Sequence, residues 1–154
     1  MKSRFARFVA TLAGLAAFAG AQAQSDDLLP VEQAFALTAT APTRDTVKFE
    51  WKIADGYYLY RGRIKTKEQP GATLGTLETP PGEAKHDEFL GDVEVYHHTA
   101  TATQTFTLAD PAAATVQLAV QIQGCHELDP KICYPPYTAK LNLTLPPVSA
   151  AAAA

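Results

Sequence analysis

The chain has 154 residues, with 13 Lys and Arg against 16 Asp and Glu, and a formal net charge of −3. That length is typical of a single domain. Charged residues make up 19% and hydrophobic residues 47% of the chain, which excludes a disordered chain and a polytopic membrane protein. Because there is no excess of basic residues, nucleic acid is not an expected partner.

Residues 1–23 have the layout of a secretory signal peptide. A basic start, an apolar run over residues 8–19 and the small-x-small tripeptide Ala21-Gln22-Ala23 follow one another in the order that such peptides show. The alternative is a membrane anchor, but this run is shorter than the ~20 apolar residues that cross a bilayer. We therefore expect cleavage after Ala23, export of the mature chain and no membrane span within it.

Beyond residue 30 the hydrophobic pattern has a period of two, which predicts β-strands. The clearest strand is 46–53, where Val47, Phe49 and Trp51 alternate with charged residues. Similar alternation predicts strands at 115–123 and 140–145. Weaker candidates lie at 33–39, 57–60, 72–77, 93–97 and 102–108. Turn residues separate these segments, and no long stretch shows the period of 3.6 that indicates a helix.

Seven or eight short strands separated by turns predict an all-β fold, an antiparallel β-sandwich, and we expect an immunoglobulin-like topology. The Cys…Trp…Cys pattern of antibody domains is absent, because Trp51 precedes both cysteines. We assign the domain to residues 24–147. The alanine-rich residues 148–154 are predicted to form a disordered tail.

Two cysteines, Cys125 and Cys133, lie in a proline-containing segment between two predicted strands. A hairpin-like loop there would bring their Cα atoms within the ~4.4–6.8 Å that a disulfide requires. Such a bridge is either a structural staple, contributing ~2.6 kcal/mol by the chain-entropy model, or a redox-active pair. From composition alone the staple is favoured, because most disulfides of exported proteins are structural.

A zinc site is the third interpretation of these residues. The cysteines together with His126, His97 and His98 would supply enough nitrogen and sulfur ligands. Two observations count against it. The cysteines lack the close C-x₂₋₄-C spacing of zinc sites, and neighbouring residues on a strand point to opposite faces. We therefore predict no metal, and treat His97 and His98 as surface residues.

Three motifs resemble the N-terminal periplasmic domain of the bacterial thiol:disulfide interchange protein DsbD. They are residues 51–61 (Trp-Lys-Ile-Ala-Asp-Gly-Tyr-Tyr-Leu-Tyr-Arg), residues 87–91 (Asp-Glu-Phe-Leu-Gly) with Glu94, Val95 and Tyr96 following, and Gln123-Gly124-Cys125 with Cys133-Tyr134-Pro135-Pro136. The motifs occur in the family's order and extend over about residues 28–145. The seven residues between the cysteines form a longer loop than the family usually has.

The resemblance implies an immunoglobulin-like domain that relays reducing equivalents in the periplasm without a cofactor. In this family the domain takes electrons from a thioredoxin-like domain, which is recharged through a membrane-embedded carrier. It passes them to periplasmic disulfide isomerases and cytochrome c maturation factors. By likeness, Cys125 and Cys133 form the redox disulfide, and Cys133 forms the mixed disulfides with partners. The competing function is that of an exported binding module with a purely structural disulfide.

The resemblance also implies a cap loop at Asp87, Glu88, Phe89, Leu90 and Gly91. Its phenylalanine would cover the disulfide until a partner docks, and Tyr58 and Tyr60 would line the site. Nearby carboxylates, with Asp87, Glu88, Glu127 and Asp129 as candidates, would raise the pKa of the thiols. The simpler alternatives are that Phe89 anchors the loop in the core, that Asp87 and Glu88 form a solvated turn, and that the tyrosines only pack a strand.

Overall fold

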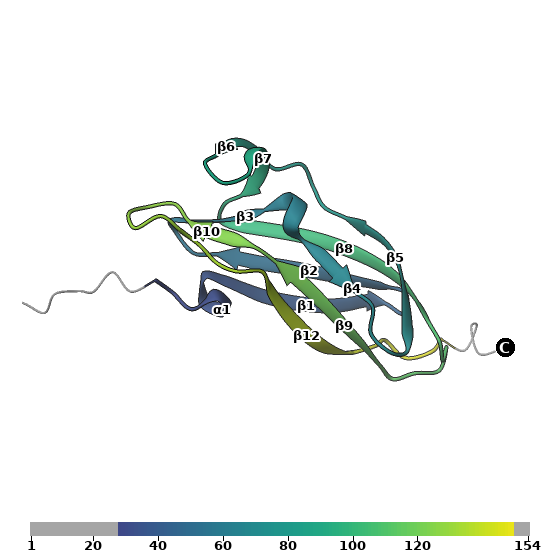
Figure 1. Ribbon diagram of the computed structural model, residues 1–154. Helices are drawn as coiled ribbons and strands as arrows, with labels where there is room; N and C mark the ends of the chain where they lie inside the picture. The colour runs from purple at the N-terminus through teal and green to yellow at the C-terminus, as the bar shows by residue number, and fades with distance from the viewer. Residues whose placement is uncertain (1–27, 150–154) are drawn as a thin grey trace, which may run out of the picture.

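The computed structural model describes residues 28–149 (Figure 1). The predicted signal peptide and residues 150–154 of the predicted tail lie outside the described residues. The elements are α1 (Val31–Ala34), β1 (Phe35–Thr43), β2 (Thr46–Ile53), β3 (Tyr57–Tyr60), η1 (Arg61–Arg63), β4 (Lys65–Lys67), β5 (Ala72–Glu78), β6 (Glu83–Asp87), β7 (Gly91–Tyr96), β8 (Thr99–Leu108), β9 (Thr115–Ile122), β10 (Gly124–His126), β11 (Ile132–Cys133) and β12 (Tyr137–Thr144). Within residues 28–149, no helix has the length and apolar character needed to cross a membrane.

Two layers of antiparallel strands form the body of the domain. One layer is the four-stranded sheet β1-β2-β8-β5. The other consists of two smaller sheets, β12-β9-β4 and β11-β10-β3-β7-β6. Only Gln123 separates β9 from β10, and its carbonyl accepts a hydrogen bond from the Tyr60 amide at 3.0 Å, so the smaller sheets continue into one another. The predicted immunoglobulin-like antiparallel β-sandwich is confirmed.

The core lies between the layers and follows from the alternation along the strands. On β2, Val47, Phe49 and Trp51 are at most 2% exposed, while the residues between them face solvent. On the facing strand β9, Leu118 and Val120 are each 1% exposed. Each such side chain stabilises the fold by roughly 1.5–3 kcal/mol relative to an exposed one. The strands predicted at 46–53 and 57–60 are confirmed with the same bounds.

Strand β3 is buried on both faces, and this arrangement positions the site. Tyr57 and Leu59 belong to the main core, whereas Tyr58 and Tyr60 belong to a second, smaller cluster with Cys125 and Val95. The β6–β7 hairpin stands out from the sandwich beside β3 and β10 (Figure 1). Because successive strand residues point to opposite faces, one short strand serves both the core and the cysteine site.

The sequence predictions differ from the structure in several strand bounds, such as 102–108 against Thr99–Leu108 and 140–145 against Tyr137–Thr144, and in the number of strands. The strand expected from residue 33 begins only at Phe35, because residues 31–34 form one helical turn in which the Gln33 and Ala34 amides donate to the Pro30 carbonyl. Four strands were not predicted at all, namely β4, β6, β10 and β11. They have three, five, three and two residues, which is too short for an alternating pattern to stand out.

Candidate functional site

The two cysteines form a disulfide across a small hairpin at one end of the sandwich. Cys125 on β10 and Cys133 on β11 lie directly opposite one another, with the sulfurs 2.01 Å apart. Their Cα atoms are 4.0 Å apart, which is closer than the expected ~4.4–6.8 Å. The hairpin-like loop expected between them is present. Cys125 is only 1% exposed, whereas Cys133 is half-buried. Of the two cysteines, Cys133 is therefore the more exposed residue.

Gly124 allows β10 to pack closely enough to place Cys125 beside the tyrosines of β3. A Cβ atom at this position would lie 2.4 Å from the Tyr58 carbonyl oxygen and 2.5 Å from Cζ of Phe35. In the observed register, Cys125 lies opposite Tyr58. Because backbone cannot move away as a flexible side chain can, the close approach requires glycine.

Strands β6 and β7 with the connecting residues 88–90 form a hairpin, called the cap hairpin below, and residues 88–90 are its tip. The Asp87 Oδ1 atom accepts hydrogen bonds from the amides of Phe89 at 2.8 Å and Leu90 at 3.0 Å. Gly91 closes the turn with φ of 76°, in the left-handed region that favours glycine. Phe89 is 64% exposed, so the interpretation of this residue as a core anchor is wrong.

Asp87 is buried at the base of this hairpin. Its other oxygen, Oδ2, accepts hydrogen bonds from the hydroxyls of Tyr58 at 2.6 Å and Tyr60 at 2.8 Å. Burial alone would raise the pKa of Asp87, but the hydrogen bonds from these hydroxyls and from the loop amides outweigh burial and lower the pKa. Asp87 is therefore an ionised buried residue and not part of a solvated turn; Glu88 remains exposed.

The Tyr60 hydroxyl connects this carboxylate to the disulfide. Its oxygen lies 3.1 Å from Sγ of Cys125 and 3.7 Å from Sγ of Cys133. Burial is the main reason that the pKa values of Tyr58 and Tyr60 are raised, and the hydrogen bonds to Asp87 raise them further. Both hydroxyls consequently stay protonated, and a line of polar contacts runs from Asp87 through Tyr60 to Cys125.

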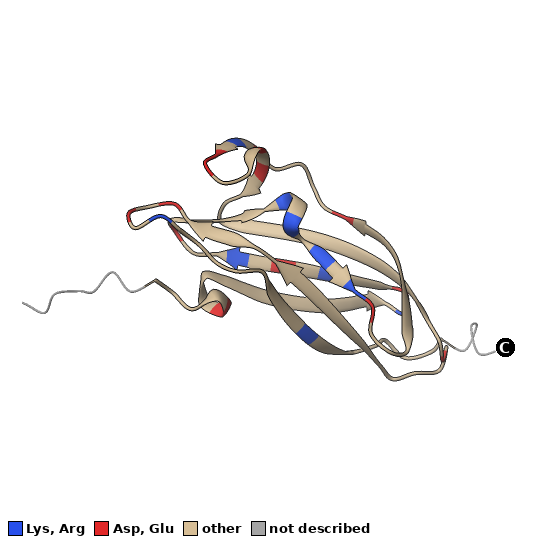
Figure 2. Cartoon of the chain, viewed as in Figure 1, with Lys and Arg blue, Asp and Glu red and all other residues tan. Residues whose placement is uncertain are grey.

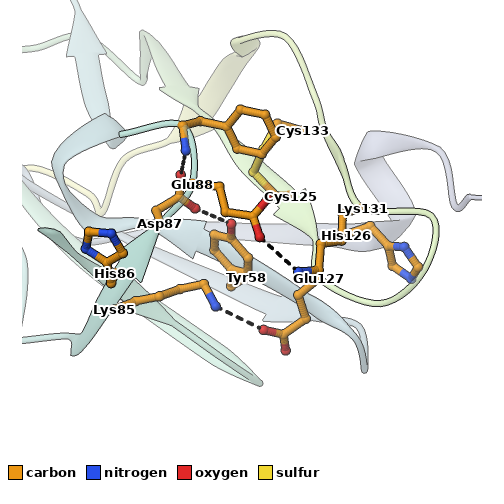
Figure 3. Close-up of a pocket in the computed structure, with 11 residues that line it drawn as sticks. Tyr58, Lys85, His86, Asp87, Glu88, Cys125, His126, Glu127, Lys131 and Cys133 are labelled. Atoms are coloured by element: carbon orange, nitrogen blue, oxygen red, sulfur yellow. Dashed lines mark hydrogen bonds and ion pairs between the residues drawn. A yellow bond between two sulfur atoms is a disulfide. The ribbon is translucent and has the colours of Figure 1, made fainter. Parts of the chain in front are cut away.

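A cavity of about 140 Å³ opens over the disulfide (Figure 3). It is lined by Tyr58, Lys85, His86, Asp87, Glu88, Phe89, Cys125, His126, Glu127, Lys131 and Cys133. The structure thus brings together both cysteines, Tyr58 and the first three cap-loop residues. Three of the four carboxylates expected near the thiols line the cavity, whereas Asp129 is exposed and does not.

Lys85 and His97 are two residues that the sequence predictions missed. The Lys85 Nζ atom lies 3.6 Å from Glu127 Oε2 and 4.8 Å from the centroid of the Tyr58 ring. His97, expected at the surface, has a side chain only 23% exposed, with its ring nitrogens 3.0 Å from Glu83 and 3.2 Å from Glu127. Had β6 been recognised as a strand, the spacing of Lys85 and Asp87 would have placed both on one face.

The metal interpretation finds no support in the geometry of the disulfide form. Both sulfurs are bonded to one another, so neither is a free thiolate ligand. The imidazole of His98 is 80% exposed and lies 3.7 Å from Asp55. Within residues 28–149, no group of three or more His, Cys, Asp and Glu side chains could hold a metal ion.

Fold and site together define an immunoglobulin-like β-sandwich with an accessible cross-strand disulfide beside a hairpin that exposes an aromatic side chain. The family model for the N-terminal region of the thiol:disulfide interchange protein DsbD matches residues 25–145. The chain belongs to this family, as the sequence motifs predicted.

Relatives and solved structures agree with this assignment. DsbD of Ralstonia nicotianae is 40% identical over 121 residues, covering 77% of this chain and 19% of its own length. DsbD of Pasteurella multocida is 36% identical over 144 residues, covering 94% of this chain and 24% of its own length. The chain therefore spans about a fifth to a quarter of the relatives it matches.

Two solved structures from Neisseria meningitidis have the same fold. The DsbD N-terminal domain in the reduced form superposes with a TM-score of 0.65 at 37% identity, covering 76% of this chain and 90% of that one. The complex between the DsbD N-terminal and PilB N-terminal domains gives a TM-score of 0.59 at 38% identity, with coverage of 76% and 88%.

Proposed function

We propose that this chain is a periplasmic thiol–disulfide exchange module, a protein-disulfide reductase that uses the Cys125–Cys133 pair. It would receive electrons from a thioredoxin-like domain or a membrane-embedded carrier, and deliver them to disulfide isomerases or cytochrome c maturation factors. The observation that carries the proposal is a disulfide that lines a cavity, in which one cysteine is half-buried, next to a buried hydroxyl–carboxylate pair. The Neisseria domain in its reduced form and in a complex supports both redox cycling and partner docking.

We infer the order of reaction from the exposure of the two cysteines. In the dithiol form, the thiolate of the more accessible Cys133 attacks an acceptor disulfide and displaces one acceptor thiolate, giving a mixed disulfide. The thiolate of Cys125 then attacks Cys133 Sγ and displaces the second acceptor thiolate. The products are the Cys125–Cys133 disulfide and an acceptor dithiol, so two electrons and two protons have passed to the acceptor.

The polar residues around Cys125 control its proton. The thiolate is the reactive form of a cysteine, and the ionised Asp87 in the same cavity repels the negative charge of a nearby thiolate. In the dithiol form the Cys125 S–H can donate to Tyr60 Oη, while the Tyr60 hydroxyl donates to Asp87. This arrangement keeps the resting dithiol slow to react, which suits a reductant in an oxidising compartment.

Phe89 acts as the cap over the sulfurs in this proposal. It lines the same cavity as both cysteines, yet it is 64% exposed. An aromatic side chain gains free energy when it is buried, so a docking partner would contact Phe89 while displacing it. Leu90, at 39% exposure, adds apolar surface at the same tip.

The reduction potential separates this function from that of a binding module with an inert disulfide. Structural disulfides usually lie below about −300 mV, whereas exchange-active ones lie higher. We expect a value above that limit in a dithiothreitol or glutathione titration. Partner trapping completes the test: Cys125→Ser, which leaves the accessible Cys133, should capture a thioredoxin-like protein as a mixed disulfide, and Cys133→Ser should capture far less. A lower potential with no trapped partner would favour the binding module.

Export is a separate part of the proposal. Residues 1–23 would direct the chain to the periplasm and be removed after Ala23. The mass of the mature protein, isolated from a periplasmic fraction, should correspond to a chain that begins at Gln24. A full-length mass in that fraction would contradict the predicted cleavage.

A further inference from the structure

The cap hairpin (β6, residues 88–90 and β7) and the inter-cysteine loop (residues 126–132) both carry charged residues (Figure 2). Ion pairs join the two segments beside the disulfide (Figure 3). The Lys131 Nζ atom lies 3.1 Å from Glu88 Oε1. The second ion pair joins Lys85 and Glu127, at 3.6 Å. In the first pair the acid belongs to the cap hairpin, and in the second the acid belongs to the inter-cysteine loop. The two pairs therefore have opposite polarity.

The inter-cysteine loop is the fixed side of this contact. The Glu127 amide donates to the Gly56 carbonyl at 2.9 Å, which ties the loop to the β2–β3 turn. Leu128 lies against Gly56, so close that a Cβ there would be 2.9 Å from Leu128 Cδ1. Inside the loop, His126 Nδ1 is 2.9 Å from the Pro130 carbonyl oxygen. The loop is held at several points besides the disulfide.

The cap hairpin is anchored at its base, where Asp87 accepts hydrogen bonds from Tyr58 and Tyr60, and is attached less firmly at its tip. β6 is an edge strand that pairs with β7, and β7 pairs with β3 through two residue pairs, Leu59 with Tyr96 and Tyr60 with Val95. Its tip carries the exposed Phe89. Ion pairs between this hairpin and the fixed loop therefore influence how long the tip stays over the sulfurs.

We propose that the pairs Glu88–Lys131 and Lys85–Glu127 are an electrostatic clasp that holds the cap hairpin against the inter-cysteine loop. Glu88 and Lys131 are positioning residues, which set how often a reactant reaches the disulfide. The inference rests on the cap role within the proposed function. The side chains of Lys131 and Glu88 are 60% and 69% exposed, and such pairs change an equilibrium by about 1.5- to 5-fold.

The test is the rate at which dithiothreitol reduces the disulfide. A dithiothreitol thiolate attacks one sulfur, and the reagent ends as a cyclic disulfide while Cys125 and Cys133 become thiols. Thiols are counted by mass-tagged maleimide after quenching. A clasp requires that Glu88→Gln and Lys131→Gln both accelerate reduction, by about 1.5- to 5-fold. Simple attraction of the anionic thiolate predicts the opposite sign for Lys131→Gln, because that change removes a positive charge.

The reversed pair Glu88→Lys/Lys131→Glu should return the rate to near that of the wild type, because the net charge is unchanged and an ion pair can form again. Two control variants should leave the rate unchanged. Glu50→Gln removes an ion pair on β2, in which Lys48 Nζ lies 3.2 Å from Glu50 and both side chains are about as exposed as those of Glu88 and Lys131. Asp92→Asn removes a pair inside the cap hairpin, with His86 at 2.7 Å, which does not reach the inter-cysteine loop.

Salt gives an independent measurement. At 1 M salt the screening length is ~3 Å, so exposed ion pairs weaken. The reduction rate of the wild type should therefore rise with KCl concentration more than the rate of the double variant Glu88→Gln/Lys131→Gln. The double variant controls for general effects of salt on the reaction. A slower or unchanged Lys131→Gln, or a reversed pair that does not restore the rate, would overturn the clasp. If Phe89→Ala accelerates reduction but the Glu88 and Lys131 variants do not, the clasp is refuted and the exchange function is unaffected. If the disulfide has a low reduction potential and traps no partner, the exchange function itself is refuted.

Discussion

Replacing Asp87 by asparagine tests the physical centre of the site. The carboxylate is 4% exposed and accepts two tyrosine hydroxyls through Oδ2, at 2.6 and 2.8 Å. Hydrogen bonds to a charged group are worth about 1.5–3 kcal/mol, and neutral ones about 0.5–1.5 kcal/mol. The amide oxygen of the asparagine side chain can still accept the two loop amides. The tyrosine hydroxyls and the loop amides all lose a charged acceptor, while a neutral amide costs less to bury than a carboxylate, so the expected net loss is about 2–3 kcal/mol at pH 7.

Urea unfolding of the oxidised protein, followed by fluorescence of the buried Trp51, measures this loss. With m of about 1–3 kcal/mol/M, the midpoint of Asp87→Asn should fall by about 0.7–3 M. The pKa of Asp87 is lower in the folded protein than in the unfolded chain. The stability that ionised Asp87 contributes is therefore complete at a pH above its unfolded-state pKa, and is lost as the pH falls through its folded-state pKa. The deficit should therefore shrink below pH ~3.9. A midpoint unchanged at pH 7, or a deficit that stays constant down to pH 2, would refute the reasoning.

Three further predictions concern the cap, the close approach of β10, and the disulfide. Phe89→Ala should accelerate the reaction of the dithiol with DTNB while changing the free energy of unfolding by less than about 0.5 kcal/mol, since the side chain is 64% exposed; an unchanged rate would contradict the cap. Gly124→Ala should destabilise the domain by more than about 3 kcal/mol, because its Cβ would meet backbone at 2.4 Å, whereas Gly62→Ala, with nothing within 4 Å, is the matched control. Cys125→Ser/Cys133→Ser should lower the free energy of unfolding by ~2.6 kcal/mol and leave a folded domain by circular dichroism, and an unfolded double variant would make the bridge a structural requirement.

The sequence predicted those parts of the fold where several residues repeat one pattern. The alternation of Val47, Phe49 and Trp51 is long enough to define β2 without any structure, because each apolar residue reinforces the same face. Strand β6 gave no such signal. Four of its five residues are Glu, Lys, His and Asp, and it forms because it pairs with β7 across a turn that Asp87 and Gly91 stabilise.

The site likewise has features that the sequence predicted and features that it could not show. The family resemblance implied that Tyr58, Asp87 and both cysteines share one site, and the structure places these residues together. Sequence could not show that His97 is partly covered, because its burial depends on Glu83 and Glu127, which belong to two other segments. Nor could it show which carboxylates reach the cavity: Glu127 and Asp129 are two residues apart in one loop, yet only Glu127 lines the cavity.

The separation of the disulfide from the main core explains how one fold can serve both redox states. Cys125 packs in the smaller cluster with Tyr58, Tyr60 and Val95, while the main core between β2 and β9 contains neither cysteine. Reducing the bond removes a nine-residue loop constraint of ~2.6 kcal/mol and leaves the buried side chains of the main core in contact. β10 pairs with β3 through residues 124–126 independently of the disulfide, so we expect Cys125 to keep its place beside Tyr60 after the bond is broken. A disulfide in the main core would lack this independence, because its reduction would disturb the packing that holds the two layers together.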